Sequence, residues 1–150
     1  MNDADVGGAW AEPVYLDASA LVKLLVPEAE SDDVNLALMS VSDVVVSDLA
    51  LTEMASALGR RTRERLLTPG QAQRLYREGL KLLRACRHVE LTPPIHRRAE
   101  RLMLSLAIPL RTLDALHLAT ALGAGAATLV TFDVRLRDAA ASQGFFTPCS

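Results

Sequence analysis

The sequence predicts an α/β domain in which a parallel sheet of four to five strands lies between two layers of helices. Short apolar runs typical of strands alternate with longer patterns typical of helices. The strand-like runs are continuously apolar, which indicates a sheet that is buried on both faces. Because strands joined by helical crossovers run parallel, we expect a three-layer α/β/α arrangement.

The length of 150 residues fits one domain, and half of the residues are hydrophobic, which is enough for a sizeable core. We expect residues 1–13 to form a disordered leader and residues 14–150 to form the domain. The leader is acidic and lacks the apolar centre of a secretory signal. The two cysteines, Cys86 and Cys149, form no zinc-binding pattern, so a reducing, cytoplasmic location is expected.

The first half of the chain shows the alternation clearly. A β-branched run at 44–47 favours a strand. Pro27 ends the helix before it, and Pro69 stands at the first position of a later helix, where its missing N–H is harmless. The predicted elements, in order, are a strand at 14–17, helices at 18–25 and 31–40, a strand at 44–47, a helix at 48–65 and a helix from 69.

The second half contains one stretch, 115–132, that is apolar enough to suggest a membrane span. Polar residues and two glycines interrupt it, so a helix, a turn and a strand are the better interpretation. The predicted elements are a strand at 88–91, a helix from 92, a helix from 112 that ends near Gly123, a strand at 128–132, a short helix from 134 and an edge strand near 145–147.

Four acidic residues stand in apolar surroundings where a lone carboxylate would be costly. One ends the first predicted strand, one follows the fourth, and two lie in the early turns of predicted helices. If the first and fourth strands are neighbours, all four converge beyond the carboxyl ends of the sheet, where open α/β folds place their sites. Hard oxygen ligands select Mg²⁺ or Mn²⁺. The predicted metal-binding and catalytic residues are Asp17, Glu53, Asp114 and Asp133.

Each acid also has a purely structural interpretation. Asp17 and Asp133 could be helix N-caps, and Asp114 could be a first-turn acid that stabilises the helix dipole. Glu53 resists such an explanation best, because no cation stands at helical spacing to pair with it. His117, three residues after Asp114, is interpreted as a packed core histidine rather than a ligand or general base.

Charge is strongly segregated along the chain. Residues 1–53 carry eleven acids and one base, whereas residues 54–111 carry four acids and thirteen bases. Arginine suits bidentate phosphate contacts, so a basic RNA track is one interpretation. The alternative is a solvated helix end with an Arg60–Glu64 pair. The candidate RNA-binding residues are Arg60, Arg61, Arg63 and Arg65.

The segments YLDASALVKL, LALTEMASAL, LRTLDALHLATAL and LVTFDVRLRDAA resemble the PIN-domain family, and more closely its VapC-type toxins of VapBC toxin–antitoxin modules. They occur in the family's order and cover nearly the whole chain after the leader. The resemblance implies an Mg²⁺- or Mn²⁺-dependent endoribonuclease that hydrolyses phosphodiester bonds in transfer or ribosomal RNA. It also implies a homodimer and a VapB-type antitoxin that blocks the cleft with a basic side chain.

The resemblance places the four acids at the family's acidic positions, with the hydroxyls of Ser19 and Thr131 near them. Family members often carry a further acid two residues after the last aspartate, where this chain has Arg135. The resemblance therefore implies weaker metal binding at that corner, and a second ion that arrives only with RNA.

Two other classes of function remain open at this stage. One is a non-catalytic α/β module that binds RNA or protein, in which the acids only cap helices. The other is a phosphatase or phosphoacceptor domain. The absence of a DxD motif after the first strand disfavours the phosphatase, and the absence of an aspartate after the third strand and of a lysine after the fourth disfavours the phosphoacceptor domain.

Overall fold

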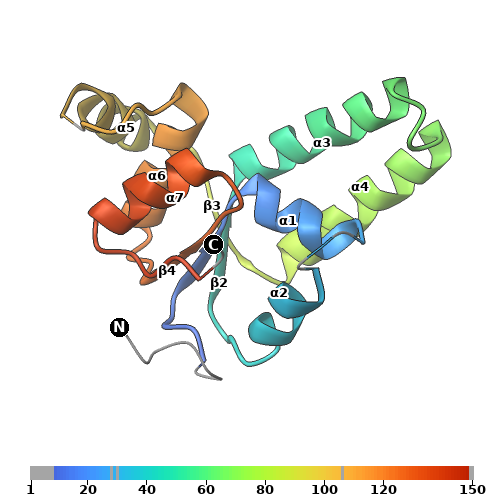
Figure 1. Ribbon diagram of the computed structural model, residues 1–150, viewed down its shortest axis with the longest axis horizontal. Coiled ribbons are helices and arrows are strands. Elements are labelled where there is room, and N and C mark those ends of the chain that lie inside the picture. Colours follow the sequence, from blue (N-terminus) through green and yellow to red (C-terminus); the bar gives the residue numbers. More distant parts are fainter. Residues whose placement is uncertain (1–8, 28, 30, 106, 149–150) are drawn as a thin grey trace.

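The computed structural model describes residues 9–27, 29, 31–105 and 107–148. Residues 1–8 of the expected leader and Cys149 lie outside the described residues. A parallel sheet of four strands, in the order β3-β2-β1-β4, forms the centre of the molecule (Figure 1). Its strands are β1 (Val14–Leu16), β2 (Val44–Ser47), β3 (Arg87–Val89) and β4 (Thr128–Val130).

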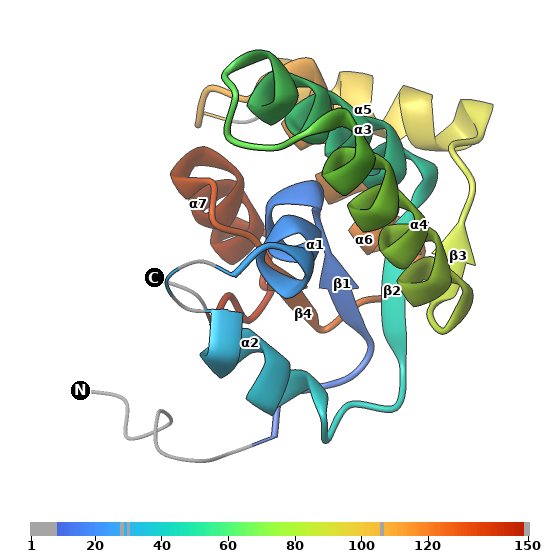
Figure 2. The same cartoon turned by 90° about the vertical axis from the view of Figure 1, so that its right-hand side faces the viewer.

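Helices cover both faces of the sheet, as Figures 1 and 2 show. On one side lie α5, α6 and α7, and on the other lie α1, α3 and α4, with α2 packed against α1. The three-layer α/β/α arrangement expected from the sequence is therefore confirmed. The helices are α1 (Ala18–Leu25), α2 (Ser31–Leu38), α3 (Asp48–Arg63), α4 (Pro69–Arg84), α5 (Pro93–Ser105), α6 (Thr112–Gly123) and α7 (Val134–Ser142).

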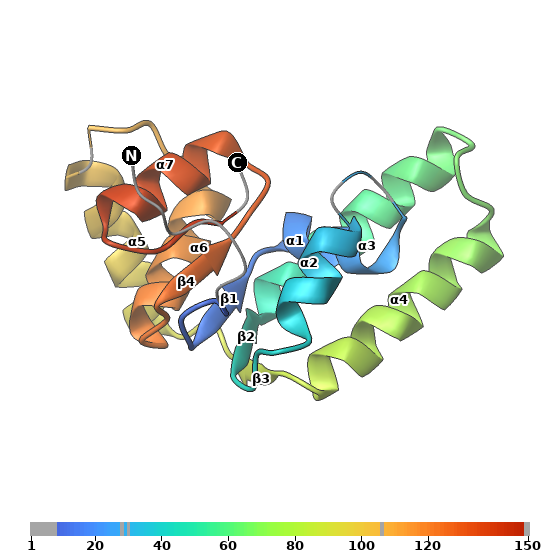
Figure 3. The ribbon, with the colours of Figure 1, turned by 60° about the horizontal axis from the view of Figure 1, so that its bottom comes forward.

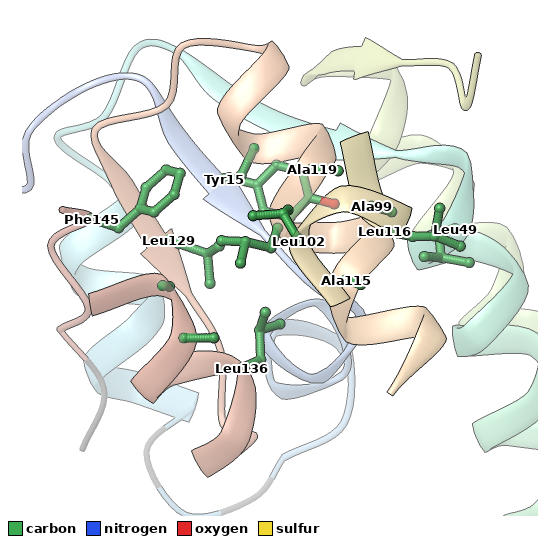
Figure 4. Close-up of a cluster of buried hydrophobic side chains, with 14 of the residues drawn as sticks. Tyr15, Leu49, Ala99, Leu102, Ala115, Leu116, Ala119, Leu129, Leu136 and Phe145 are labelled. Carbon is green, nitrogen blue, oxygen red and sulfur yellow. The ribbon is translucent and has the colours of Figure 1, made fainter. Parts of the chain in front are cut away.

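The two central strands, β1 and β2, are almost wholly apolar because the sheet has a hydrophobic core on each face. Tyr15, Val45 and Leu129 point towards α5, α6 and α7, where they meet side chains such as Leu102 and Leu136 (Figure 4). The alternate strand residues pack against α1, α3 and α4 on the opposite face. These alternate residues are Val14, Leu16, Val46 and Val130.

The chain before β1 is anchored to the body further upstream than the sequence indicated. The carbonyl oxygen of Ala11 accepts a 2.7 Å hydrogen bond from the Thr128 hydroxyl. The Glu12 carboxylate accepts hydrogen bonds from the backbone and hydroxyl of Ser42, and Trp10 packs against the second core. The expectation of a disordered leader therefore does not hold for residues 10–13, because partners distant in sequence fix them.

The expected edge strand near 145–147 is reduced to one parallel bridge between Phe146 and Thr128. The stretch 115–132 divides, as expected, into most of α6, a turn containing Gly125 and strand β4. Within the part of the chain that the structure describes, no helix is long and apolar enough to cross a membrane.

Helices α3 and α4 form an antiparallel hairpin that extends away from the sheet (Figure 3). The Thr68 hydroxyl caps α4 by accepting the backbone N–H of Gln71, and the Gln71 side-chain oxygen accepts the backbone N–H of Thr68. The two bonds form a capping box. Nearer the sheet, the buried Gly79 lets α4 pack closely against the fully buried Met54 of α3. The residue that follows Glu53 is thus held by close packing between the two helices.

We expect Gly79→Ala to lower the free energy of unfolding by about 1 kcal/mol, measured by urea titration. A Cβ at Gly79 would lie 2.7 Å from the Met54 sulfur, so overpacking exceeds the gain of about 1 kcal/mol in helix propensity. Gly70→Ala is the matched control, because nothing lies within 4 Å of its added Cβ. It should be neutral or stabilising by about 0.4–1 kcal/mol, and equal effects at the two positions would contradict the packing argument.

Candidate active site

Two of the four acids lie where neighbouring strands end. Strands β1 and β4 pair directly, and Asp17 and Asp133 follow them. Both are helix N-caps: Asp17 accepts a hydrogen bond from the backbone N–H of Ala20, and Asp133 accepts from Arg135 and Leu136. The two helices α1 and α7 therefore begin at the same edge of the sheet, with an acid at each start.

Asp17 is the most buried of these acids, with 4% of its surface exposed. Its Oδ1 atom accepts hydrogen bonds from Ala20 N–H at 2.9 Å and from the Ser19 hydroxyl at 2.7 Å. The Thr131 hydroxyl donates to Oδ2 at 2.5 Å. Burial raises the pKa of this carboxyl, against the opposing influence of His117 and of the hydrogen bonds.

Glu53 receives its partner from another helix. Its Oε1 atom lies 2.5 Å from Nε2 of His117 on α6, and a carboxylate there can only accept the bond. The other ring nitrogen, Nδ1, lies 2.6 Å from the buried Tyr15 hydroxyl, which also contacts Ser47. His117 is thus a packed core histidine, as interpreted from the sequence, and it also orients Glu53.

Arg111 joins the remaining two acids. Its Nε atom lies 3.3 Å from Asp114 Oδ2, and its Nη2 atom lies 2.8 Å from Asp133 Oδ2. These carboxylates raise the pKa of the guanidinium, chiefly through the hydrogen bond from Arg111 to Asp114. Asp114 is nearly buried in the first turn of α6, whereas the Asp133 side chain is 29% exposed.

All four acids line one cavity of about 440 Å³. Among the described residues, however, no three carboxylate, histidine or cysteine groups are already close enough to enclose a metal ion. Each acid is instead held by a partner from the protein: hydroxyls and an amide at Asp17, His117 at Glu53, and Arg111 at Asp114 and Asp133. The donor set fits a hard divalent cation in chemistry, and a cation, Arg111, already lies between two of its members.

A groove of about 420 Å³ adjoins this cavity and shares Ser19, Glu53 and Leu113 with it. One face of α3 forms much of its wall, because residues at helical spacing all line it. These residues are Glu53, Ser56, Ala57, Arg60 and Arg61. The small side chains at the middle of this face leave room for a ligand between the acid and the two arginines.

The structure changes two expectations about individual residues. Glu53 is partly exposed, at 27% of its side chain, and is paired with a histidine, so a metal is not needed to explain its position. Arg63 and Arg65, which the structure also describes, are exposed near the end of the hairpin and are not among the residues lining the groove.

Sequence reasoning missed Arg111 and Tyr15. Arg111 precedes Asp114 by three residues, a spacing at which helical side chains meet. The pair with Asp114 could therefore have been predicted from the sequence. The contact of Arg111 with Asp133, and the contact of Tyr15 with a histidine 102 positions away, depend on the folded chain.

The PIN domain family model matches residues 14–142. Ribonuclease VapC46 of Mycobacterium tuberculosis is 40% identical over 138 residues, which is 87% of this chain and 92% of that protein. Ribonuclease VapC45 of the same species is 38% identical over 134 residues, covering 87% of this chain and 91% of that protein.

Solved structures share the fold at lower identity. The M. tuberculosis toxin VapC20, which cleaves the sarcin–ricin loop, has a TM-score of 0.69 and 18% identity over 88% of this chain and 95% of that chain. A toxin–antitoxin complex from Klebsiella pneumoniae has a TM-score of 0.64 and 20% identity over 90% of this chain and 97% of that chain.

We expect Asp17→Asn to raise the melting temperature of the metal-free protein near neutral pH, because it removes a buried charge and keeps a good N-cap. A raised folded-state pKa gives stability that is present in acid and lost as pH rises through that pKa. The variant should not lose this stability. Its melting temperature near neutral pH should exceed that of the wild type by roughly 2–4 °C for each kcal/mol of unfolding free energy gained.

Calorimetry at several pH values between acid and neutral tests this expectation. Asp138→Asn is the matched control, because Asp138 is exposed and does not line the cavity. A melting temperature of Asp17→Asn below that of the wild type at neutral pH would contradict the argument from burial.

Proposed function

We propose that in this chain, which belongs to the PIN domain family, the acid-lined cavity is the active site of a divalent-metal-dependent endoribonuclease. The chain is a ribonuclease of the VapC type, the toxin of a toxin–antitoxin system. The observation that carries the site assignment is that carboxylates from β1, α3, α6 and the β4–α7 connection line a single cavity. Residues 14–150 form the one nuclease unit.

In this proposal Asp17, Glu53, Asp114 and Asp133 hold Mg²⁺ or Mn²⁺. Such an ion supplies the charge that activates water and stabilises the transition state of phosphodiester hydrolysis. The protein positions the oxygens: hydroxyls and the α1 N-terminus hold Asp17, and His117 holds Glu53. Carboxylates held by such partners need little rearrangement at the moment of reaction.

Arg60 and Arg61 extend the site along the groove. They lie about two helical turns beyond Glu53 on the same face of α3, and they line the groove together with it. A phosphodiester backbone in this groove would meet two guanidinium groups suited to phosphate. This arrangement supports RNA as the substrate, of the transfer or ribosomal RNA class.

Two protein partners belong to the proposal. A VapB-type antitoxin would present a basic side chain to the cavity, as the resemblance implies for the family. A homodimer is supported by large apolar side chains that are exposed on the helical surface, such as Leu104 on α5 and Val134 on α7. Light scattering would test the dimer. The site of action is the cytoplasm, where RNA is available.

Asp17→Asn, Glu53→Gln and Asp114→Asn should each lower RNA cleavage more than roughly 100-fold, because loss of an outer partner of a metal site alone costs roughly 10–100-fold. EDTA should abolish cleavage, and Mg²⁺ or Mn²⁺ should restore it. Cleavage of a labelled RNA on denaturing gels is the measurement, with Asp138→Asn as a control that retains full activity. Wild-type activity in the Asp114→Asn protein would refute the assignment of the site.

Arg60→Gln and Arg61→Gln should weaken RNA binding and reduce its dependence on salt. Each lost phosphate contact lowers the slope of log affinity against log salt by about 0.7 for a single strand. Fluorescence anisotropy with an RNA oligonucleotide at several salt concentrations measures this slope. Arg74→Gln on α4 is the matched control, since Arg74 is exposed and does not line the groove. An equal effect of all three changes would indicate general charge attraction instead of a track.

A further inference from the structure

Arg111 occupies an unusual place for an exposed arginine. It is the N-cap residue of α6, and its side chain, 63% exposed, reaches across to the connection between β4 and α7. Among the described residues that line the acid-lined cavity, it is the only arginine or lysine. Both of its ion pairs are with acids that the proposed function assigns to the metal.

Arg111 binds one carboxylate oxygen of each of these two acids. Asp133 uses Oδ1 to cap α7, accepting the backbone N–H groups of Arg135 and Leu136. Its Oδ2 takes no part in this cap, and Arg111 Nη2 holds it at 2.8 Å. Asp114 likewise offers Oδ2 to Arg111 Nε. A divalent cation bound to these two oxygens would lie against a guanidinium of like charge.

A displaced Arg111 side chain would remain at the mouth of the cavity, because its backbone is fixed at the start of α6. The adjoining groove shares Leu113, two residues along the same helix, with this cavity. RNA that lies along Arg60 and Arg61 would therefore bring a phosphate near Arg111. The five N–H donors of a guanidinium match phosphate oxygens well.

We propose that Arg111 exchanges partners during function: it holds Asp114 and Asp133 in the metal-free protein, releases them to the divalent cation, and then binds the phosphate of the RNA at the cleavage site. Arg111 thereby becomes a catalytic residue in addition to the acids. The RNA contact rests on the proposed ribonuclease function, whereas the release of the two acids does not.

Two measurements test the exchange, and they should change in opposite directions: Mn²⁺ affinity should rise and the rate of RNA cleavage should fall. In Arg111→Gln, calorimetric titration with Mn²⁺ alone should show affinity raised by roughly two- to tenfold, because the two ion pairs of a largely exposed arginine no longer compete. At saturating Mn²⁺, the same variant should cleave RNA with kcat lowered roughly tenfold or more. A residue with a purely structural role would lower both.

Arg97→Gln is the matched control, because Arg97 pairs with Glu100 at the same three-residue spacing and is 65% exposed, but lies on α5 away from the cavity. It should change neither readout. Arg111→Lys keeps the charge but cannot span two carboxylates with one fork, so its Mn²⁺ affinity should lie between those of the wild type and Arg111→Gln.

Unchanged or weaker Mn²⁺ binding by Arg111→Gln overturns the exchange. Undiminished cleavage at saturating Mn²⁺ overturns the contact with RNA. If the wild-type protein cleaves no RNA, the proposed function fails, and the Mn²⁺ titration still decides whether Arg111 competes for the two acids.

Discussion

The carboxylate of Asp17 joins two neighbouring strands and a helix at the carboxyl edge of the sheet. It ends β1, caps α1, and accepts the Thr131 hydroxyl from the chain that leaves β4. Because β1 and β4 are neighbours, this bond closes the sheet at its carboxyl edge and fixes where α1 begins. Asp133 and Asp114 lie at this edge as well, because α7 packs against β4 and α6 packs against β2. The buried carboxylate at the edge of the sheet is therefore also part of the site.

Helix α6 brings two chemical groups into the site from an almost wholly buried segment. Asp114 and His117 are three residues apart and face the cavity together, while apolar neighbours such as Leu118 fill the core. His117 is bonded at both ring nitrogens, to Tyr15 from β1 and to Glu53 from α3. One histidine thus joins the sheet and two helices. The acids are satisfied by protein groups, which explains how a cluster of carboxylates can fold without a bound cation.

Much of this architecture could be predicted from the sequence, because apolar runs and helix signals are local. The three layers and the cleft with Asp17 and Asp114 are examples. At Asp17, capping and metal ligation do not exclude each other, because the carboxylate has enough oxygen lone pairs for both.

The remaining features depend on contacts between distant parts of the chain. No local pattern pairs Glu53 with a histidine 64 residues away, or Ala11 with the Thr128 hydroxyl. The same reason accounts for the anchoring of the residues before β1.

Helix α3 also fixes the distance between the acids and the arginines of the groove. Glu53 and Arg60 belong to one uninterrupted helix, so their separation along its axis is set by the helical rise at about 10 Å. The close contact between Gly79 and Met54 holds this helix against α4 near its acidic end. An RNA phosphate bound by Arg60 and Arg61 would therefore lie at a constant distance from the acids. The helix backbone would therefore set the distance along the RNA between the bound phosphate and the acids, independently of the base sequence.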